Sequence, residues 1–244
     1  MALFTDGPIA SIEDLHGYDT QLLDVANTEG IDVTRKLAQA QEEIGVELKA
    51  LLARVCSPVH IGNVAVTSPL RLWHVFRSLE MVYRDAFNSQ LNDRYGGKRD
   101  EYHDLAKWAQ DRVIQSGLGM TADPIPQASQ PTVRTAAGSL ADGTYYVAMA
   151  WVNAADEEGA ASRPAKVTIS GSSFDVQHGE APANAKGWHV YVGSSPSVML
   201  RQNVTLLGLE ATWRQPDVLA TGKQAGSGQV PGFVLAVPRV VLRG

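Results

Sequence analysis

Residues 117–131, GLGMTADPIPQASQP, divide the chain into two parts with different hydrophobic periods. The stretch shows no apolar periodicity and holds three prolines, which favour extended backbone and do not continue a helix. Apolar residues recur at helical spacing before it, and they alternate with polar residues after it. The sequence therefore predicts an α+β multidomain protein, with a helical domain over residues 1–116, a linker over 117–131 and a β-sandwich domain over 132–244.

The helical part is expected to contain four helices. Ser11 and Asp32 are residue types that cap helix N-termini, and Ser68 followed by Pro69 gives the same signal for the third helix. Gly30 ends the first helix, as glycine does just past a helix C-terminus. The predicted helices cover residues 12–29, 33–55, 68–95 and 98–116, with Gly-Gly between the last two.

The third of these helices carries an unusually broad apolar surface. At about 100° per residue its large apolar side chains cover an arc of roughly 180°, wider than the stripe a surface helix needs. Two interpretations stay open. The helix is central and covered by its three neighbours, or part of the arc is covered by another subunit. The arc consists of Leu72, Trp73, Val75, Phe76, Leu79, Val82, Tyr83 and Phe87.

The part after the linker has a period of two and predicts an antiparallel sandwich. Alternation places Trp188, Val190 and Val192 on one face of their strand and Tyr191 on the other. Its tryptophans are expected in the core, and an exposed aromatic platform for sugar is the alternative. The predicted strands are TYYVAMAWV (144–152), AKVTIS (165–170), SFDVQH (173–178), GWHVYVG (187–193), LRQNVTLL (200–207) and EATWRQ (210–215).

Composition and charge exclude several classes of protein. The net charge is −5, and residues 1–120 hold 12 Lys and Arg against 17 Asp and Glu, so the acidity lies in the helical part. A surface that grips DNA needs the opposite balance. The single cysteine, Cys56, excludes an internal disulfide framework, and no apolar run approaches the roughly 20 residues of a membrane span.

No pattern in the sequence predicts an enzyme. The six histidines lack metal-ligand spacing, and the carboxylate pairs fall on expected helix surfaces or at a hairpin. Gly117-Leu-Gly119-Met-Thr-Ala122 matches a loose dinucleotide fingerprint but follows a helix instead of a strand. We therefore expect no catalytic residue, metal, cofactor or small-molecule substrate.

Residues 70–119, LRLWHVFRSLEMVYRDAFNSQLNDRYGGKRDEYHDLAKWAQDRVIQSGLG, resemble head-to-tail connector (adaptor) proteins of tailed bacteriophages and prophages. The similarity extends over roughly residues 9–131 and includes SIEDLHGYDTQLLDVANTEGIDVTRKLAQAQEEIG at 11–45. It rests on helix pattern and aromatic spacing. The resemblance implies a unit of four or five helices that forms a ring, commonly of twelve copies. That ring docks between the portal and the tail or head-closure proteins, and DNA passes through it.

The resemblance also implies roles for individual side chains. Contacts between neighbours in a ring need two different complementary patches on one subunit, and aromatic residues beside charges of both signs suit that need. The aromatic residues assigned to core and inter-subunit packing are Trp73, Tyr83, Phe87, Tyr95, Tyr102 and Trp108. The residues assigned to polar contacts between neighbours are Arg84, Asp85, Asp93, Arg94, Lys98, Arg99 and Asp100.

A second resemblance concerns the β part. Residues 144–169, TYYVAMAWVNAADEEGAASRPAKVTI, are similar to the last two strands of a fibronectin type III module, joined by a hairpin at Asp-Glu-Glu-Gly. Residues 173–195 and 210–215 are similar to its earlier strands. The strand order is therefore expected to be rotated along the chain, which a sandwich with neighbouring termini tolerates.

The C-terminal segment PGFVLAVPRVVLRG, residues 231–244, leaves two interpretations open. It is the last strand of the sandwich, or it is an extended arm that adds to a sheet or groove of a neighbouring protein. Pro238 favours an edge strand or an arm. The residues assigned to the arm are Phe233, Leu235, Val237, Arg239, Val241 and Arg243.

The function expected from the sequence is that of a virion structural protein in the neck of a phage particle, assembled in the host cytoplasm. It would form a homo-oligomeric ring, contact the portal and a tail or head-closure protein, and let DNA pass without binding it specifically. The alternative is a phage surface or tail module whose sandwich binds host glycan or protein. A hydrolase with a site assembled from distant residues is a further rival.

Overall fold

The computed structural model describes residues 2–55, 58–90 and 93–237. The chain divides into two compact units. The helical unit comprises Gly7–Met120 together with the segment that begins at Pro231, and the β unit comprises Thr121–Val230 together with the residues before Gly7. The predicted linker is therefore not a separate segment, because its residues are shared between the two units. The predicted sandwich domain likewise loses its C-terminal segment to the helical unit.

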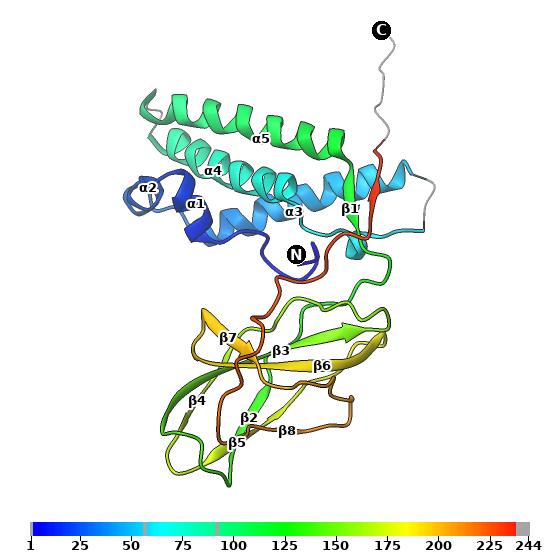
Figure 1. Cartoon of the computed structure of the whole chain (residues 1–244). Coiled ribbons are helices and arrows are strands. Elements are labelled where there is room, and N and C mark those ends of the chain that lie inside the picture. The colour runs from blue at the N-terminus through cyan, green and yellow to red at the C-terminus, as the bar shows by residue number, and fades with distance from the viewer. Residues whose placement is uncertain (1, 56–57, 91–92, 238–244) are drawn as a thin grey trace. The chain divides into compact units, whose positions relative to one another are not determined.

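The described residues of the helical unit form five α-helices where four were predicted (Figure 1). The predicted first helix is split at Asp19, which caps the end of α1 and turns its carboxylate inward. The expected caps at Ser11, Asp32 and Gly30 are present. The helices are α1 (Ile12–Tyr18), α2 (Leu22–Glu29), α3 (Val33–Ala53), α4 (Ser68–Gln90) and α5 (Gly96–Ser116), with short 3₁₀ turns at Ile61–Asn63 and Asp93–Tyr95.

Helix α4 lies at the centre of the helical unit, with α1, α2, α3 and α5 packed around it (Figure 1). Residues 73–76 and 78–83 are all buried, and within that run only Arg77 is half-buried. The broad apolar arc is thus covered by the unit's own helices. This arrangement is the first of the two interpretations of that arc, and it leaves little of the arc for another subunit.

The helical unit is closed by two short strands that are far apart in the sequence. Strand β1 (Leu118–Met120) pairs antiparallel with β9 (Phe233–Leu235), so that Met120 is opposite Phe233 (Figure 1). The β unit is therefore inserted between two neighbouring strands of the helical unit. In its described part, residues 231–237, the C-terminal segment forms no strand of the β unit's sheets, which contradicts the first interpretation for that part. Arg239, Val241 and Arg243 lie outside the described residues.

In the described part of the β unit, the strands form two antiparallel sheets. One has the order β4-β3-β6-β7 and the other β2-β5-β8. Side chains of both sheets share one core, in which Trp151, Trp188 and Phe174 are almost fully buried. The strands are β2 (Thr132–Ala136), β3 (Gly143–Asn153), β4 (Ala165–Ile169), β5 (Ser173–Gln177), β6 (Ala185–Ser195), β7 (Val198–Arg201) and β8 (Trp213–Arg214).

The strand predictions were right for four segments and incomplete for the others. β2 was not predicted, and the predicted strand over residues 200–207 is mostly irregular. There the Asn203 side chain accepts a hydrogen bond from Val190 N at 2.9 Å, so a side chain replaces a backbone acceptor beside β6. Alternation along β6 is confirmed, because Trp188 packs in the shared core and Tyr191 packs on the opposite face.

Candidate assembly surfaces of the helical unit

Four of the aromatic residues predicted at an interface are buried in the helical unit itself. Trp73, Tyr83, Tyr95 and Tyr102 are all at most 5% exposed. The rings of Tyr83 and Tyr102 stack with centroids 5.6 Å apart, and Tyr83 also packs against Tyr95. Their area stabilises the folded subunit, so they are core residues, and of the four only Trp73 also lines an open groove of the unit.

Asp19 holds this aromatic core together with ionic hydrogen bonds. The hydroxyls of Tyr83 and Tyr102 each donate to Asp19 Oδ2 at 2.8 Å, and Gln21 N donates to Oδ1 at 3.0 Å. Burial disfavours the charge of Asp19, but these hydrogen bonds outweigh it and lower the pKa of the carboxyl. Burial and the bonds to Asp19 raise the pKa of both tyrosines, so their hydroxyls remain donors.

Several predicted polar residues make their contacts within the subunit. Lys98 Nζ lies 3.2 Å from Glu101 Oε2 and 3.8 Å from the buried carboxylate of Asp19. The Arg99 guanidinium lies 4.4 Å from the centroid of the half-buried Phe87 ring, where it makes a cation–π contact. The contact of Arg99 joins α5 to the end of α4, and the contact of Lys98 with Asp19 joins α5 to the end of α1.

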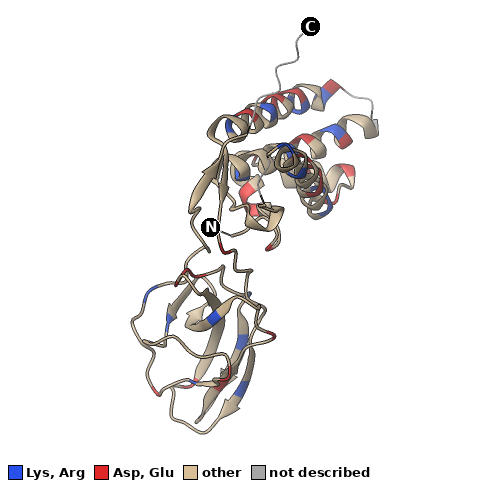
Figure 2. Cartoon of the chain, turned by 90° about the vertical axis from the view of Figure 1, so that its right-hand side faces the viewer, with Lys and Arg blue, Asp and Glu red and all other residues tan. Residues whose placement is uncertain are grey.

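The other predicted polar residues are divided between pairing and exposure. Asp85 of α4 forms an ion pair with Lys36 of α3. Arg84, Asp93 and Arg94 are exposed, and the Arg94 guanidinium lies 5.4 Å from the centroid of the Tyr95 ring. Figure 2 shows residues of both signs along the helices.

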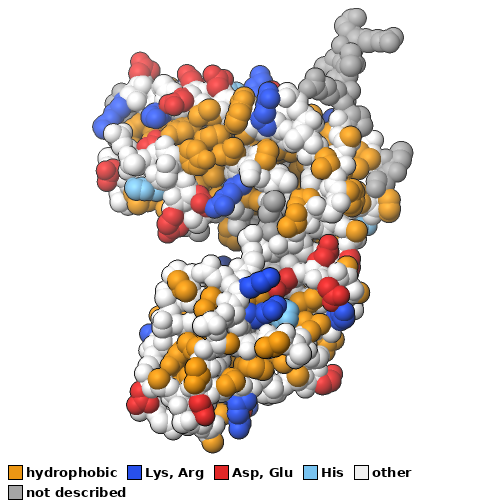
Figure 3. Space-filling view, in the orientation of Figure 1, with side chains coloured by type: hydrophobic (Ala, Val, Ile, Leu, Met, Phe, Trp, Pro, Cys, Tyr) orange, Lys and Arg blue, Asp and Glu red, His pale blue; other side chains and the backbone are white. Residues whose placement is uncertain are grey.

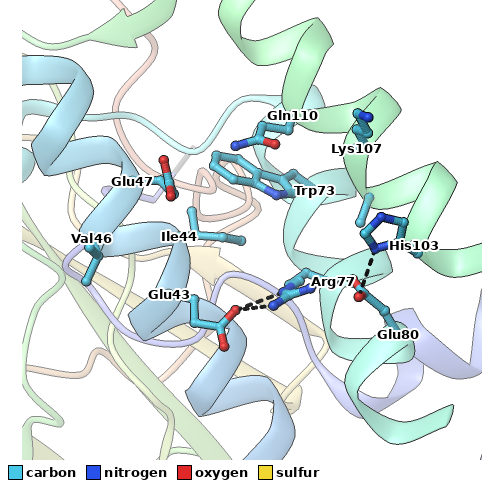
Figure 4. A pocket seen from close by; sticks show the side chains of 11 residues that line it. Glu43, Ile44, Val46, Glu47, Trp73, Arg77, Glu80, His103, Lys107 and Gln110 are labelled. Atoms are coloured by element: carbon cyan, nitrogen blue, oxygen red, sulfur yellow. Dashed lines mark hydrogen bonds and ion pairs between the residues drawn. The ribbon is translucent and has the colours of Figure 1, made fainter. Parts of the chain in front are cut away.

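We consider two open surfaces of the helical unit, and the first is a groove between α3 and α5 with α4 at its base (Figure 4). Its volume is about 620 Å³. Trp73, Ile44 and Ala106 supply buried apolar surface, and the exposed Val46 lies beside them on α3. The polar lining residues are Glu43, Glu47, Arg77, Glu80, His103, Lys107 and Gln110.

A chain of ionic contacts crosses this groove from α3 to α5 (Figure 4). Arg77 donates from Nε to Glu43 Oε2 at 2.8 Å and from Nη1 to Glu80 Oε2 at 2.6 Å. The other oxygen of Glu80 lies 3.1 Å from His103 Nδ1. Burial opposes the charge of Arg77, but the two carboxylates outweigh it and raise the pKa of the guanidinium. These contacts fix α3, α4 and α5 relative to one another.

The second open surface is an apolar flank on the other side of α5. Trp108 is 48% exposed, with the Arg112 guanidinium 5.9 Å from its ring centroid. Tyr18 of α1 is also exposed and meets the Phe76 ring edge-on at 5.2 Å. Hydrophobic side chains gather over α4 and α5 on the face shown in Figure 3. We define the apolar flank as the exposed Tyr18 and Trp108 together with the half-buried Leu72 and Leu105.

Helix α5 separates the two surfaces. At about 100° per residue, its groove positions 103, 107 and 110 and its flank positions 105, 108 and 112 lie about half a turn apart. Of the aromatic residues predicted at an interface, Trp108 is the exposed one. Tyr18, Arg77 and Glu80 were missed, and the signal available for the last two was a charged pair at i and i+3 inside an apolar run.

Within the described ranges of the chain, no group of three or more His, Cys, Asp or Glu side chains is arranged to hold a metal ion. The described residues also form no helix that is long and apolar enough to cross a bilayer. In the β unit, Trp151 and Trp188 are buried and Trp213 is half-buried, so these rings do not form the exposed platform considered for sugar binding. Comparison of the chain with protein-family models and with curated proteins gave no match.

Proposed function

We propose that this protein is a structural component of a tailed phage particle, a head-to-tail adaptor that assembles into a ring between portal and tail. The supporting observation is the pair of unlike surfaces on opposite flanks of α5. A ring closes through heterologous contacts, in which one patch of a subunit meets a different patch of the next. The groove and the apolar flank supply two such patches on one helical unit.

The chemistry of the two surfaces is complementary. The apolar flank presents Trp108 with Arg112 beside it, and the groove presents an apolar base with Glu43 and Glu47 at its edge. Aromatic and arginine side chains that enter a partly desolvated pocket carry much of the energy of protein interfaces. In the proposed ring, Trp108 of one copy enters the groove of the next, and Arg112 approaches its carboxylates.

The charge balance supports a passage for DNA. Residues 1–120 carry five more acidic than basic side chains, from 12 Lys and Arg against 17 Asp and Glu. Negative walls repel phosphates over distances near the screening length of about 10 Å, so DNA would move through the ring without being held.

The strand order within the two sheets supports a fibronectin III architecture, but the order along the chain is not a simple rotation, because β2, the counterpart of strand A, precedes the β3–β4 hairpin. The order β2-β5-β8 corresponds to strands A, B and E of that module, and β4-β3-β6-β7 corresponds to G, F, C and C′. In this assignment the hairpin β3–β4 supplies the last two strands of the module. The β unit would reinforce neighbouring subunits or decorate the exterior of the particle, since it is inserted at the β1–β9 pair.

Electron microscopy of the purified protein, alone and mixed with portal, tests the proposal. Rings are expected in at least one condition, and a lone monomer in both would overturn it. Trp108→Ala should weaken assembly by more than about fivefold, because a central interface side chain contributes above about 1 kcal/mol. Leu23→Ala, at an exposed apolar residue of α2, is the matched control and should assemble normally. Glu47→Lys should weaken assembly, and Glu42→Lys on the same helix should not.

A further inference from the structure

Strand β1 has the features of an acceptor for another strand. All three of its residues are buried. It pairs with β9 along one edge, and Met120 forms a bridge with Val64 of the segment before α4. Gly232 N donates to Met120 O at 2.9 Å, which extends the pairing beyond β9. The small sheet is therefore complete only when a strand occupies the β9 position.

Two glycines of the sequence GLGM shape this acceptor. A Cβ on Gly117 would lie 2.6 Å from Val234 Cγ1, and Gly117 also has a φ of +79°. A Cβ on Gly119 would lie 2.9 Å from Pro231 Cγ and 2.8 Å from Thr67 Cγ2. Residues of the incoming strand thus lie so close to the backbone at positions 117 and 119 that a side chain is excluded at both. The close approach of the arm explains why positions 117 and 119 are glycine. The loose match of these residues to a dinucleotide-binding fingerprint gave no such reason.

The donor is an apolar arm, residues 231–237, with the sequence PGFVLAV and no charged side chain. In the folded chain Phe233 remains 40% exposed and Val234 remains 62% exposed. Strands of this kind pair readily with other chains. The last firmly held residue before the arm is Gln229, whose side chain bonds Ile125 N and Asp123 O. Only Val230-Pro231-Gly232 connect that anchor to β9.

The contacts between β1 and the arm are the same when both come from one chain and when they come from two chains. The connecting residues 230–232 therefore decide whether β1 pairs with the arm of its own chain or with that of a neighbour. A short hinge that contains proline favours exchange of the terminal element between identical chains. We propose that, in the assembled ring, the acceptor strand β1 of each copy binds the arm of its neighbour. The exchange rests on the proposed ring function. It ties each subunit to the next through backbone hydrogen bonds, beside the side-chain contacts of the groove and the apolar flank.

Cysteine cross-linking tests the exchange. Leu118 and Leu235 are directly opposite each other, and such pairs have Cα atoms about 4.5–5.5 Å apart, within reach of a disulfide. One chain carries Cys56→Ser with Leu118→Cys, and a second carries Cys56→Ser with Leu235→Cys. The two chains are mixed in equal amounts, assembled and oxidised. Exchange predicts covalent dimers on a denaturing gel, because only pairing between chains can join these cysteines.

The double variant Leu118→Cys, Leu235→Cys in the same background provides the reference. With exchange it should give a ladder of covalent multimers, and without exchange it should give only an internally linked single chain. Rings in electron micrographs together with internally linked chains would overturn the exchange but would still support the proposed ring function. Absence of rings would overturn the proposed function instead. Each single-cysteine chain oxidised alone should give no covalent dimer, which controls for random disulfides.

Discussion

The two units of this protein keep polar side chains in their interiors for different reasons. In the helical unit the buried polar groups include the ionised Asp19 and Glu80, which bond to tyrosine hydroxyls and to Arg77. In the β unit the buried polar side chains are neutral. They are Asn153, Ser162, Ser173, Gln202, Asn203, Gln215 and Gln229, with Thr121 at the start of the unit.

Backbone hydrogen bonding explains the difference. A helix satisfies its own peptide groups, so buried side chains between helices bond mainly to each other. The irregular segments of the β unit leave peptide groups that need partners, and the amides supply them. Gln202 Oε1 accepts from Ala220 N at 2.8 Å, and Gln229 Oε1 accepts from Ile125 N at 2.7 Å. We therefore expect the helical unit to be held by titratable contacts and the β unit chiefly by apolar burial and neutral amides.

The largest effect is expected from the β core. Trp188 is 0% exposed between the two sheets, so Trp188→Ala should lower the free energy of unfolding of the β unit by about 3–5 kcal/mol. Denaturant unfolding measures the loss, and hydrogen exchange assigns it to residues 121–230. Val204→Ala, at a side chain 90% exposed, should stay within about 0.5 kcal/mol. Equal loss of protection in the helical unit would show that the two units unfold together.

Removal of the central carboxylate should have the next largest effect. Asp19→Ala leaves the buried hydroxyls of Tyr83 and Tyr102 without their acceptor, at a cost of about 1–3 kcal/mol for each. Thermal unfolding of the helical unit measures the loss. Tyr102→Phe removes one donor and leaves Asp19 its bond from Tyr83, so it should cost less. A larger loss for Tyr102→Phe than for Asp19→Ala would contradict the central role of the carboxylate.

The hydrogen bonds of Asp19 also predict that the helical unit loses stability at low pH. The folded pKa of Asp19 lies below its ordinary value of 3.8. Its contribution to stability is therefore present above about pH 3.8 and is lost as the pH falls through the lower folded pKa. Asp19→Asn should remove this part of the pH dependence. Unfolding curves recorded between pH 5 and 2 on both proteins check the prediction, and parallel curves would contradict it.

Histidine burial predicts a smaller effect at milder pH. His74 is fully buried, with Nε2 3.0 Å from Leu37 O, and burial lowers its pKa below 6.5. Below pH 6.5 the unfolded chain binds a proton that the folded chain does not, so stability falls by up to about 1.4 kcal/mol per pH unit. His74→Gln should flatten this slope in the helical unit. His189→Gln is the matched change in the β unit, where burial also lowers the histidine pKa.

The smallest effect is expected from removing the β unit. Met120 and Phe233 are opposite each other, so replacing residues 121–232 by Asn-Gly should close a two-residue hairpin between β1 and β9. The helical unit should keep its unfolding midpoint and its circular dichroism, because β1 and β9 stay paired. The residues before Gly7 belong to the β unit, and Asp6 loses its hydrogen bond from Gln127 N. Loss of helical structure would show that the helical unit depends on the insertion.

Local patterns in the sequence were sufficient for much of the helical unit. The caps at Ser11 and Asp32 and the glycine at Gly30 predicted helix ends to within a few residues, because capping is a contact between near neighbours. The split at Asp19 was missed because its cause is a pair of tyrosines 64 and 83 residues away.

The candidate surfaces were less predictable than the fold. Helical periodicity identified Trp73 and Tyr83 as apolar surface of α4 but could not say which helix covers them. Packing of the subunit buries both and leaves Trp108 exposed. The residues of the groove come from α3, α4 and α5, and no local pattern brings them together.

The sequence by itself determined the α+β class, the change of period after residue 117 and most helix ends, because each depends on residues within one or two turns of the chain. Tertiary structure alone decided that β9 returns to β1, that the β unit is an insertion, and that α4 is enclosed by its own neighbours. The physical reason is that pairing and burial depend on groups that lie far apart in the sequence, more than a hundred residues for β1 and β9. A strand of three residues such as β9 is also too short for its sequence to predict which strand it pairs with.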